Sequence, residues 1–384
     1  MTKKKRIRKK HHTKLRKIPS VGYFGIFILI FGIILVNISL ISTNNEISTI
    51  NNEEKKQNLN KIDPNSAQDE IIQVVTSTAL IKDFVDNIGG DAVKTTGILV
   101  EGSEDPHTYE PTQSEITALV EAEIFILMGR EGLEPWWEGS GGYAQVVLED
   151  NPDLKVVKIM NESMIRMDPL TNAPNPHGWT SPIVAKEMCR NIYLNLTEEA
   201  TSAQQDDLRE SFENYMTKLD GVINEINGNK TKLQGTKVVM HHPAMMYLYD
   251  LLGIERVAII EEQHDVEPSA QHIQEIKEIM ESSETNKIVH QTNLDHDTIV
   301  EIAKDTNSTI ILSAPLIGME DYFGNTISSY LELIRANIQA FDNPLVADDL
   351  SEGGYIDGLS LSVLIPVAIF SVMGIVILLK KKKI

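Results

Sequence analysis

The sequence has a single cysteine, Cys189, among its 384 residues. One cysteine cannot form an intramolecular disulfide, a zinc site of several thiolates or an iron–sulfur cluster. Any metal ion must therefore be bound by histidine and carboxylate side chains. The phosphate-binding pattern Gly-x-x-x-x-Gly-Lys-Ser/Thr is also absent, which excludes an ATPase that uses this loop. An isolated cysteine among apolar helical neighbours is typical of a small core residue.

Basic residues are scarce in the middle of the chain. Fourteen of the 35 Lys and Arg residues lie in two end segments, 1–20 and 380–384, which leaves 21 basic against 55 acidic residues between them. A strongly acidic surface repels nucleic acid and attracts cations, so we expect no nucleic-acid partner. The composition, 42% hydrophobic and 23% charged, is typical of a globular protein rather than a disordered one.

Two long uncharged runs, residues 21–41 and 358–379, have the length of a membrane-spanning helix, about 20 residues. The basic end segments flank both runs, and such clusters stay in the cytoplasm. We therefore expect both termini to be cytoplasmic and the acidic middle to be extracytoplasmic, with residues 42–68 and 343–357 as tethers. A cleaved signal peptide is the alternative for the first run, although such peptides have apolar stretches of only about 7–15 residues.

Between the tethers, short β-branched runs alternate with longer helical stretches, which indicates β-α units and mainly parallel sheets. Residues 203–226 carry apolar side chains at three- and four-residue spacing, which predicts one long helix. The sequence thus predicts an α/β fold of two lobes, residues 69–200 and 231–342, joined by a linking helix over residues 201–230. Strands are expected at residues 71–78, 95–100, 124–128, 156–159, 237–240, 257–260, 287–290 and 309–312, and shorter helices at 81–88 and 181–196.

Three histidines lie in loops that follow a predicted strand or open a predicted helix. His107 lies in Asp-Pro-His-Thr-Tyr-Glu-Pro, His177 lies in Asn-Pro-His-Gly-Trp, and His242 follows a strand and precedes a proline. Ligands bind at the carboxyl ends of strands in open α/β sheets, and imidazole suits zinc, copper, iron and nickel. Together the three histidines favour a zinc site, whereas each one alone is more typical of a surface or structural residue.

The ordered set of motifs resembles the metal-specific substrate-binding proteins of ABC importers, which capture zinc or manganese outside the cell. The likeness covers about residues 74–341. It implies two α/β lobes with a rigid backbone helix and a metal ion between the lobes, bound by His107, His177 and His242. Besides the loop around His107, the motifs are Glu-Pro-Trp at 134–136, Pro-His-x-Trp-x-x-Pro at 176–182, His-Pro-Ala-x-x-Tyr at 242–247 and Glu-Pro-Ser-Ala at 267–270.

The sequence departs from this family at the fourth metal ligand, usually an aspartate after the last strand. Ala314 stands where the carboxylate is expected, and Asn175 replaces the usual aspartate before Pro-His. The site could be completed by water, by Glu320 or by Asp321, or it could have lost its function. Zinc accepts three protein ligands plus water, whereas manganese prefers oxygen ligands. We therefore expect zinc rather than manganese, with manganese as the other possible cargo.

The resemblance implies a membrane-tethered capture protein, without enzymatic activity, that delivers a divalent metal to an ABC permease and its ATPase. One alternative is a zinc-dependent hydrolase that uses the same three histidines. Against it, the sequence has no His-Glu-x-x-His helix and no carboxylate clearly paired to act as a base. The other alternative is a surface adhesin on the same scaffold with a degenerate metal site.

For the other conspicuous residues the sequence predicts ordinary core or surface positions. Residues 261–267 are rich in Glu and Asp and predict a solvated acidic loop. Trp136 and Trp137 are expected in the core or on a lobe surface rather than around a ligand. Four further histidines lie among acidic residues and are expected at the solvated surface: His264, His272, His290 and His296.

Overall fold

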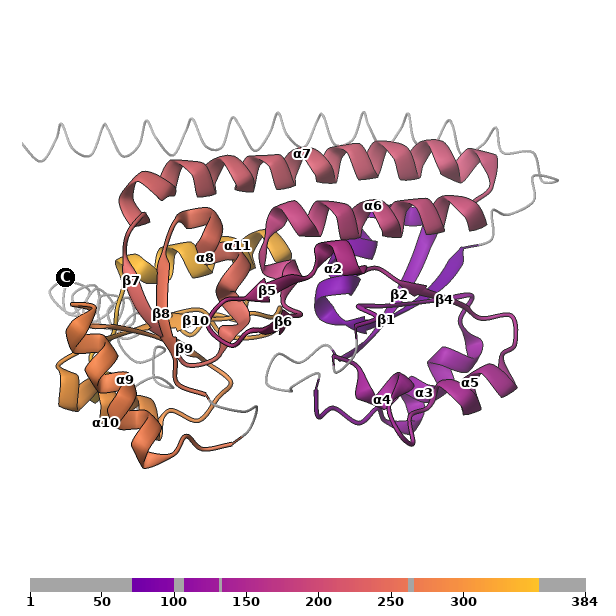
Figure 1. Ribbon diagram of the computed structural model, residues 1–384. Coiled ribbons are helices and arrows are strands. Elements are labelled where there is room, and N and C mark those ends of the chain that lie inside the picture. The colour runs from indigo at the N-terminus through magenta and orange to yellow at the C-terminus, as the bar shows by residue number, and fades with distance from the viewer. Residues whose placement is uncertain (1–70, 100–106, 131–132, 262–265, 352–384) are drawn as a thin grey trace, which may run out of the picture. The chain divides into compact units, whose positions relative to one another are not determined.

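The computed structural model describes residues 71–99, 107–130, 133–261 and 266–351 (Figure 1). These residues belong to one compact unit that begins at Asp69. Within the described residues, no helix is both long enough and apolar enough to cross a membrane.

The two predicted membrane spans, residues 21–41 and 358–379, lie outside the described residues, as do the basic end segments and the tether at 42–68. These assignments therefore stay predictions.

The first lobe contains a four-stranded parallel sheet in the order β2-β1-β3-β4. Alternate side chains of these strands enter two separate apolar clusters, one on each face of the sheet. Helices α2 and α6 pack on one face, and α3 to α5 lie on the other (Figure 1). The elements are β1 (Ile72–Thr78), α2 (Ala79–Gly89), β2 (Val93–Leu99), α3 (Gln113–Glu121), β3 (Ile124–Leu127), α4 (Pro135–Glu138), α5 (Ala144–Asp150), β4 (Lys155–Lys158) and α6 (Pro182–Glu199).

The second lobe repeats this architecture with a parallel sheet in the order β10-β9-β7-β8. Helices α9, α10 and α12 pack on one face of the sheet, and α8 and α11 contribute to the cluster on the other face. The elements are β7 (Lys237–Met240), α8 (Met246–Leu252), β8 (Glu255–Ile259), α9 (Ala270–Ser282), β9 (Lys287–Gln291), α10 (Asp297–Thr306), β10 (Thr309–Ser313), α11 (Tyr330–Gln339) and α12 (Ala347–Ser351).

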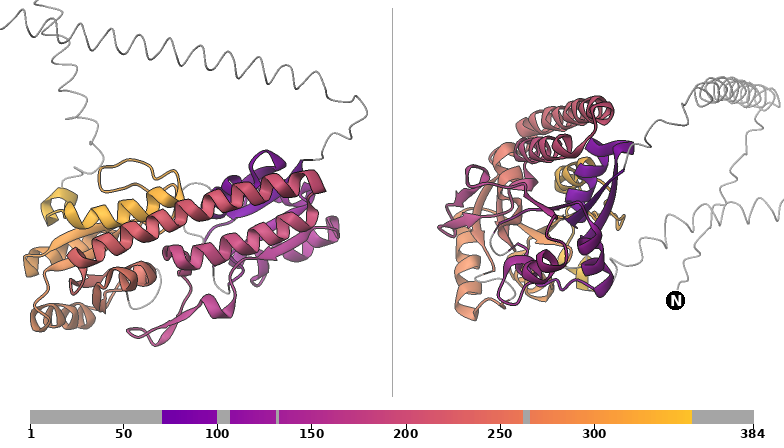
Figure 2. Two further views of the ribbon diagram at one scale, coloured as in Figure 1. Left: turned by 90° about the horizontal axis from the view of Figure 1, so that it is seen from above. Right: turned by 90° about the vertical axis from the view of Figure 1, so that its right-hand side faces the viewer.

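A 32-residue helix, α7 (Ser202–Leu233), runs along both lobes (Figures 1 and 2). It starts at a capping box in which Thr201 and Gln204 satisfy each other's backbone N–H groups. At about 1.5 Å per residue it is about 48 Å long. It contacts α2 and α6 of the first lobe and α8 and α11 of the second. The predicted long helix is thus confirmed, and it is one rigid element common to both lobes.

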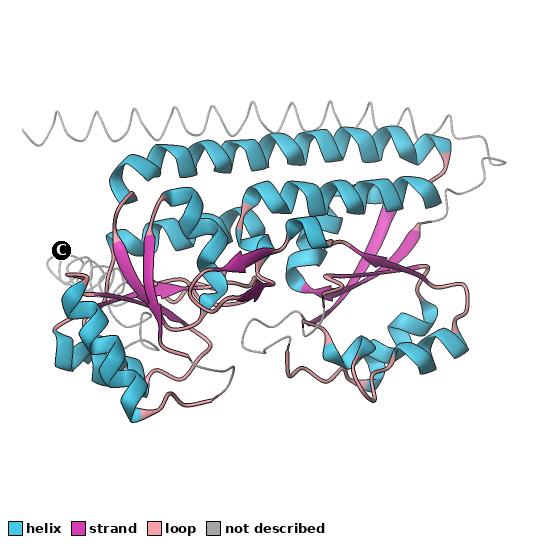
Figure 3. Ribbon diagram, viewed as in Figure 1, coloured by secondary structure: helices cyan, strands magenta, loops and turns pink. Residues whose placement is uncertain are grey.

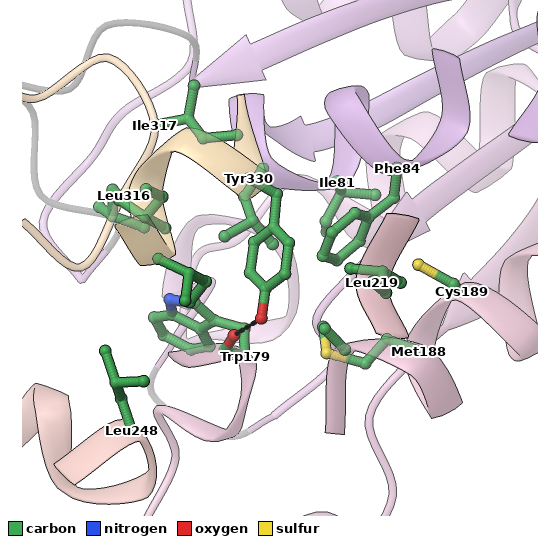
Figure 4. Close-up of a cluster of buried hydrophobic side chains, with 14 of the residues drawn as sticks. Ile81, Phe84, Trp179, Met188, Cys189, Leu219, Leu248, Leu316, Ile317 and Tyr330 are labelled. Atoms are coloured by element: carbon green, nitrogen blue, oxygen red, sulfur yellow. Dashed lines mark hydrogen bonds between the residues drawn. The ribbon is translucent and has the colours of Figure 1, made fainter. Parts of the chain in front are cut away.

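The largest apolar cluster is shared by the two lobes, since it contains residues of α2, α6, α7, α8 and α11 together. Tyr330, at the start of α11, inserts its ring among these helices (Figure 4) and packs edge-on against Phe84, with the ring centroids 5.0 Å apart. Its hydroxyl donates to the carbonyl oxygen of Trp179 at 2.8 Å. The indole N–H of Trp179 donates to the carbonyl oxygen of Pro315 at 2.8 Å. Buried polar bonds therefore connect segments far apart in the sequence.

An antiparallel hairpin of β5 (Arg166–Asp168) and β6 (Ala173–Asn175) leads from the first sheet to α6 (Figure 3). It is anchored to the second lobe by a salt bridge in which the Arg256 guanidinium of β8 donates to both carboxylate oxygens of Asp168, at 2.8 and 3.3 Å. The two side chains are only 4% and 1% exposed. A buried charge without its partner is strongly destabilising, so this pair fixes the hairpin against β8.

The structure confirms the α/β fold with mainly parallel sheets, and the observed strands lie within two residues of the predicted ranges. The hairpin was not predicted. Part of the expected tether at 343–357 is instead the short helix α12, because Ala347 and Leu350 are buried against the second lobe. Trp136 and Trp137 lie in the core of the first lobe, as expected.

We predict that Arg256→Met lowers the free energy of unfolding by about 3–5 kcal/mol, because it leaves the Asp168 carboxylate buried and unpaired. The measurement is urea unfolding of the detergent-purified full-length chain, followed by tryptophan fluorescence. The matched control is Arg209→Met, which removes an exposed arginine paired with Asp206 and should change stability by less than about 1 kcal/mol. Equal effects of the two substitutions would contradict the role given to the buried pair.

Candidate metal site

Two of the three predicted histidines meet where the lobes face each other. His177 lies between β6 and α6, and His242 follows β7 in the second lobe. Their Nε2 atoms are 3.3 Å apart and their rings are perpendicular. The residues are 6% and 8% exposed. The third, His107, lies in the loop before α3, with its ring centroid 6.3 Å from that of His177. The structure therefore brings two of the three into direct contact, with the ring of His107 beside that of His177.

The other nitrogen of each paired ring faces an oxygen acceptor. His177 Nδ1 lies 2.9 Å from Asn175 Oδ1, which also accepts from the His177 backbone N–H at 3.0 Å. The Asn175 amide nitrogen donates to the carbonyl oxygen of Pro243 at 2.9 Å, which fixes Oδ1 as the acceptor. His242 Nδ1 contacts the carboxylate of Glu261. Each Nδ1 therefore faces an oxygen acceptor, and the two Nε2 atoms face each other.

Glu261 is the residue that the sequence interpretation missed. The acidic stretch at 261–267 was expected to be solvated, yet the Glu261 side chain is only 9% exposed and forms an ion pair with His242 when that ring is protonated. Glu261 follows the carboxyl end of β8, and its backbone N–H donates to the carbonyl oxygen of His241 at 3.0 Å. The sequence did contain one indication of this position, because Glu261 closely follows the predicted strand that became β8, the neighbour of β7 in the sheet.

The positions proposed for a fourth ligand lie around one small cavity. Ala314, Glu320 and Asp321 all line it. Ala314 is buried, and both of its backbone polar groups bond to the Asn337 side chain. Asp321 Oδ1 accepts backbone N–H groups at the turn that follows, and Glu320 is exposed. Within the described residues, no three His, Cys, Asp or Glu side chains are already grouped to hold a metal ion.

The prediction of a solvated surface was wrong for His290, which is 3% exposed in β9. Burial lowers the pKa of His290 to about 3 and that of its neighbour His241 to about 4, so both rings are neutral at pH 7. His272 and His296 are partly buried, and His264 lies outside the described residues. Apolar strand neighbours, rather than the acidic residues near it in sequence, determine the surroundings of His290.

Residues 74–343 match the family profile described as zinc-uptake complex component A, periplasmic. The chain belongs to the ZnuA family. The resemblance inferred from the motifs is thus confirmed, and this family serves metal transport.

Curated ZnuA-family relatives are named for different metals. The chain is 23% identical to the manganese-binding lipoprotein MntA of Halalkalibacterium halodurans, over 73% of this chain and 90% of that protein. It is also 23% identical to the high-affinity zinc uptake system protein ZnuA of Bacillus subtilis, over 72% and 88%. It is 21% identical to the zinc-binding lipoprotein AdcA of Streptococcus pneumoniae, over 70% of this chain, and spans only about half of that protein, 55%.

Solved structures of this family share the fold. A crystal structure of ZnuA aligns with a TM-score of 0.59 at 22% identity, over 71% of this chain and 99% of that one. The laminin-binding protein Lmb of Streptococcus agalactiae, described as having adhesin and metal-transporting activity, aligns with a TM-score of 0.57 at 21% identity, over 71% and 98%. At these identities the likeness shows the fold alone.

We predict that Asn175→Asp lowers the free energy of unfolding by about 1–3 kcal/mol. The substitution removes the donor to Pro243 and places a second carboxylate beside that of Asp168, which lies 3.3 Å from the amide nitrogen. Urea unfolding at pH 7 in the presence of a chelator measures the loss. Asn229→Asp on α7 is the control, since that amide bonds only within an exposed helical turn; a loss as large there would contradict the prediction.

Proposed function

We propose that this ZnuA-family chain captures a divalent transition metal as cargo, zinc rather than manganese, and delivers it to an ABC permease driven by a cytoplasmic ATPase. The single observation that carries the proposal is the pair of buried Nε2 atoms of His177 and His242, 3.3 Å apart. They come from different lobes, so the cargo would be bound between the lobes.

This distance suits a shared metal ion. Two nitrogen ligands at the zinc–nitrogen distance of about 2.0–2.1 Å in tetrahedral geometry are about 3.3–3.4 Å apart. Without a metal ion, two lone pairs at this distance repel unless they share a proton. A metal ion takes the place of that proton, and its affinity would therefore fall as the pH falls. His107, whose ring lies beside that of His177, is the proposed third ligand.

Zinc is favoured over manganese because the three proposed protein ligands are all nitrogen donors. Ala314 supplies no carboxylate, and a three-histidine zinc site is complete with one water molecule. Glu320 and Asp321 line the cavity beside Ala314, so either one is a possible fourth ligand. Manganese prefers oxygen donors and would depend on such a carboxylate far more than zinc does.

The proposed location is the outer side of a cell membrane. Family relatives are named as lipoproteins and as a periplasmic component. The uncharged runs at 21–41 and 358–379, with their flanking basic segments, would anchor this chain at both ends and leave the two lobes outside. Both termini would then be cytoplasmic, provided that the first run is retained.

We predict that His177→Ala and His242→Ala each weaken zinc binding by more than about 100-fold, and that replacing His107 as well abolishes binding at this site. Loss of a residue that only supports a ligand already costs about 10–100-fold. Calorimetric titration of the metal-stripped full-length chain with zinc and with manganese measures both affinities. His272→Ala in α9 is the control and should leave the zinc affinity unchanged. Manganese binding as tight as zinc binding would overturn the choice of metal.

We predict that Glu261→Gln lowers the zinc affinity by about 10–100-fold, because the carboxylate holds the proton on His242 Nδ1 and raises the basicity of Nε2. The matched control is Glu267→Gln, which changes an exposed glutamate in the same loop. Competition with a chromophoric zinc chelator measures both variants. An unchanged affinity in Glu261→Gln would show that the carboxylate does not support the ligand.

A further inference from the structure

A second pair of histidines lies at the carboxyl edge of the same sheet. His241 Nδ1 and His290 Nδ1 are 3.0 Å apart, and the two rings are stacked with their centroids 5.1 Å apart. A third ring, that of His296, lies 6.5 Å from His290 between centroids. The proposed function uses none of these three side chains.

The register of the sheet places this pair on the opposite face from His242. Val239 and Ile288 are paired across β7 and β9 and point into the cluster under α9 and α10. Side chains alternate along a strand, so His241 and His290, two residues further on, point to that same face. His242, two residues after Met240, points to the other face of the sheet, where Met240 packs in the core shared by the lobes. The two histidine pairs are therefore separate, although they start from consecutive residues.

The chemistry of the second pair suits a borderline metal ion. Imidazole nitrogens suit zinc, copper, iron and nickel, and the two Nδ1 atoms of this pair face each other at 3.0 Å. The nitrogen separation is slightly shorter than the about 3.3 Å expected for two ligands of tetrahedral zinc. The turn between His290 and His296 also contains Asn293, whose buried side-chain oxygen has no hydrogen-bond partner in the described structure. Such an oxygen needs a donor or a cation.

We propose that His241 and His290 bind a second transition-metal ion, zinc or an ion of similar preference, on the outer face of the second lobe's sheet. In the metal-free chain one Nδ1–H donates to the other Nδ1. When the ion binds, the donor ring changes tautomer and carries its proton on Nε2, so that both Nδ1 atoms present a lone pair to the ion and both rings stay neutral. Asn293, His296 or water would complete the coordination. The carboxylates of Glu261 and Asp295 act electrostatically on His241, and their negative charge offsets repulsion between ions at the two sites.

The test is the zinc stoichiometry of the metal-stripped full-length chain, measured by calorimetry and by metal analysis after gel filtration. We expect two zinc ions in the wild type and one in His241→Phe or His290→Phe, which keep an aromatic ring but lose the nitrogen. The affinity of the remaining ion should change by less than about threefold. His272→Phe in α9 is the control and should still bind two ions. His290 is buried, so His290→Phe could fail to fold. In that case the result for His241→Phe, at the more exposed position, decides the question.

The outcomes separate this inference from the proposed function. If His177→Ala/His242→Ala retains one zinc ion that His241→Phe removes, the second site is established whether or not the first one binds cargo. If His241→Phe binds as many zinc ions as the wild type, with the same affinities, the second site does not exist. Cobalt provides an independent measurement, because its visible absorption reports the ligands around it. The wild type loaded with cobalt should show the spectra of two histidine sites, and His241→Phe should lose one of them.

Discussion

A single buried amide, that of Asn175, connects the two histidine loops that meet between the lobes. Its oxygen accepts from both the backbone and the ring of His177, and its nitrogen donates to the carbonyl of Pro243, directly after His242. An aspartate could accept from His177 but could not donate to Pro243. The substitution that departs from the family pattern thus has a structural reason. The nearby carboxylate is instead that of Asp168, which accepts from the Asn175 amide nitrogen and forms a salt bridge with Arg256.

The site contrasts with the negative charge of the chain around it. His177 and His242 are nearly buried where the lobes meet, while the acidic residues that attract cations are mostly exposed. In the proposed function, long-range attraction of cations by exposed charges would be separate from final coordination by the buried rings, since exposed charges are screened within about 10 Å at moderate salt. A buried site of nitrogen donors gives selectivity for borderline ions, and an acidic surface raises the local concentration of all cations.

The sequence was sufficient for the sheets and for the histidine loops, because buried parallel strands are short β-branched runs and ligands follow their carboxyl ends. It did not predict the hairpin of β5 and β6, because each of these strands has only three residues and so short a segment shows no periodicity. It also could not assign Glu261 and His290. Both lie among acidic residues in the sequence, and only the pairing of β7 with β8 and β9 decides what each one contacts.

The position of Tyr330 bears on how the chain folds. This residue begins the last long helix, yet it bonds to Trp179 and its backbone N–H donates to Asp83 in α2, nearly 250 residues earlier. The first lobe therefore cannot complete its core when its own segment has left the ribosome. Domains of many proteins fold one after another during synthesis. Here the core common to both lobes closes only after almost the whole described chain has been made.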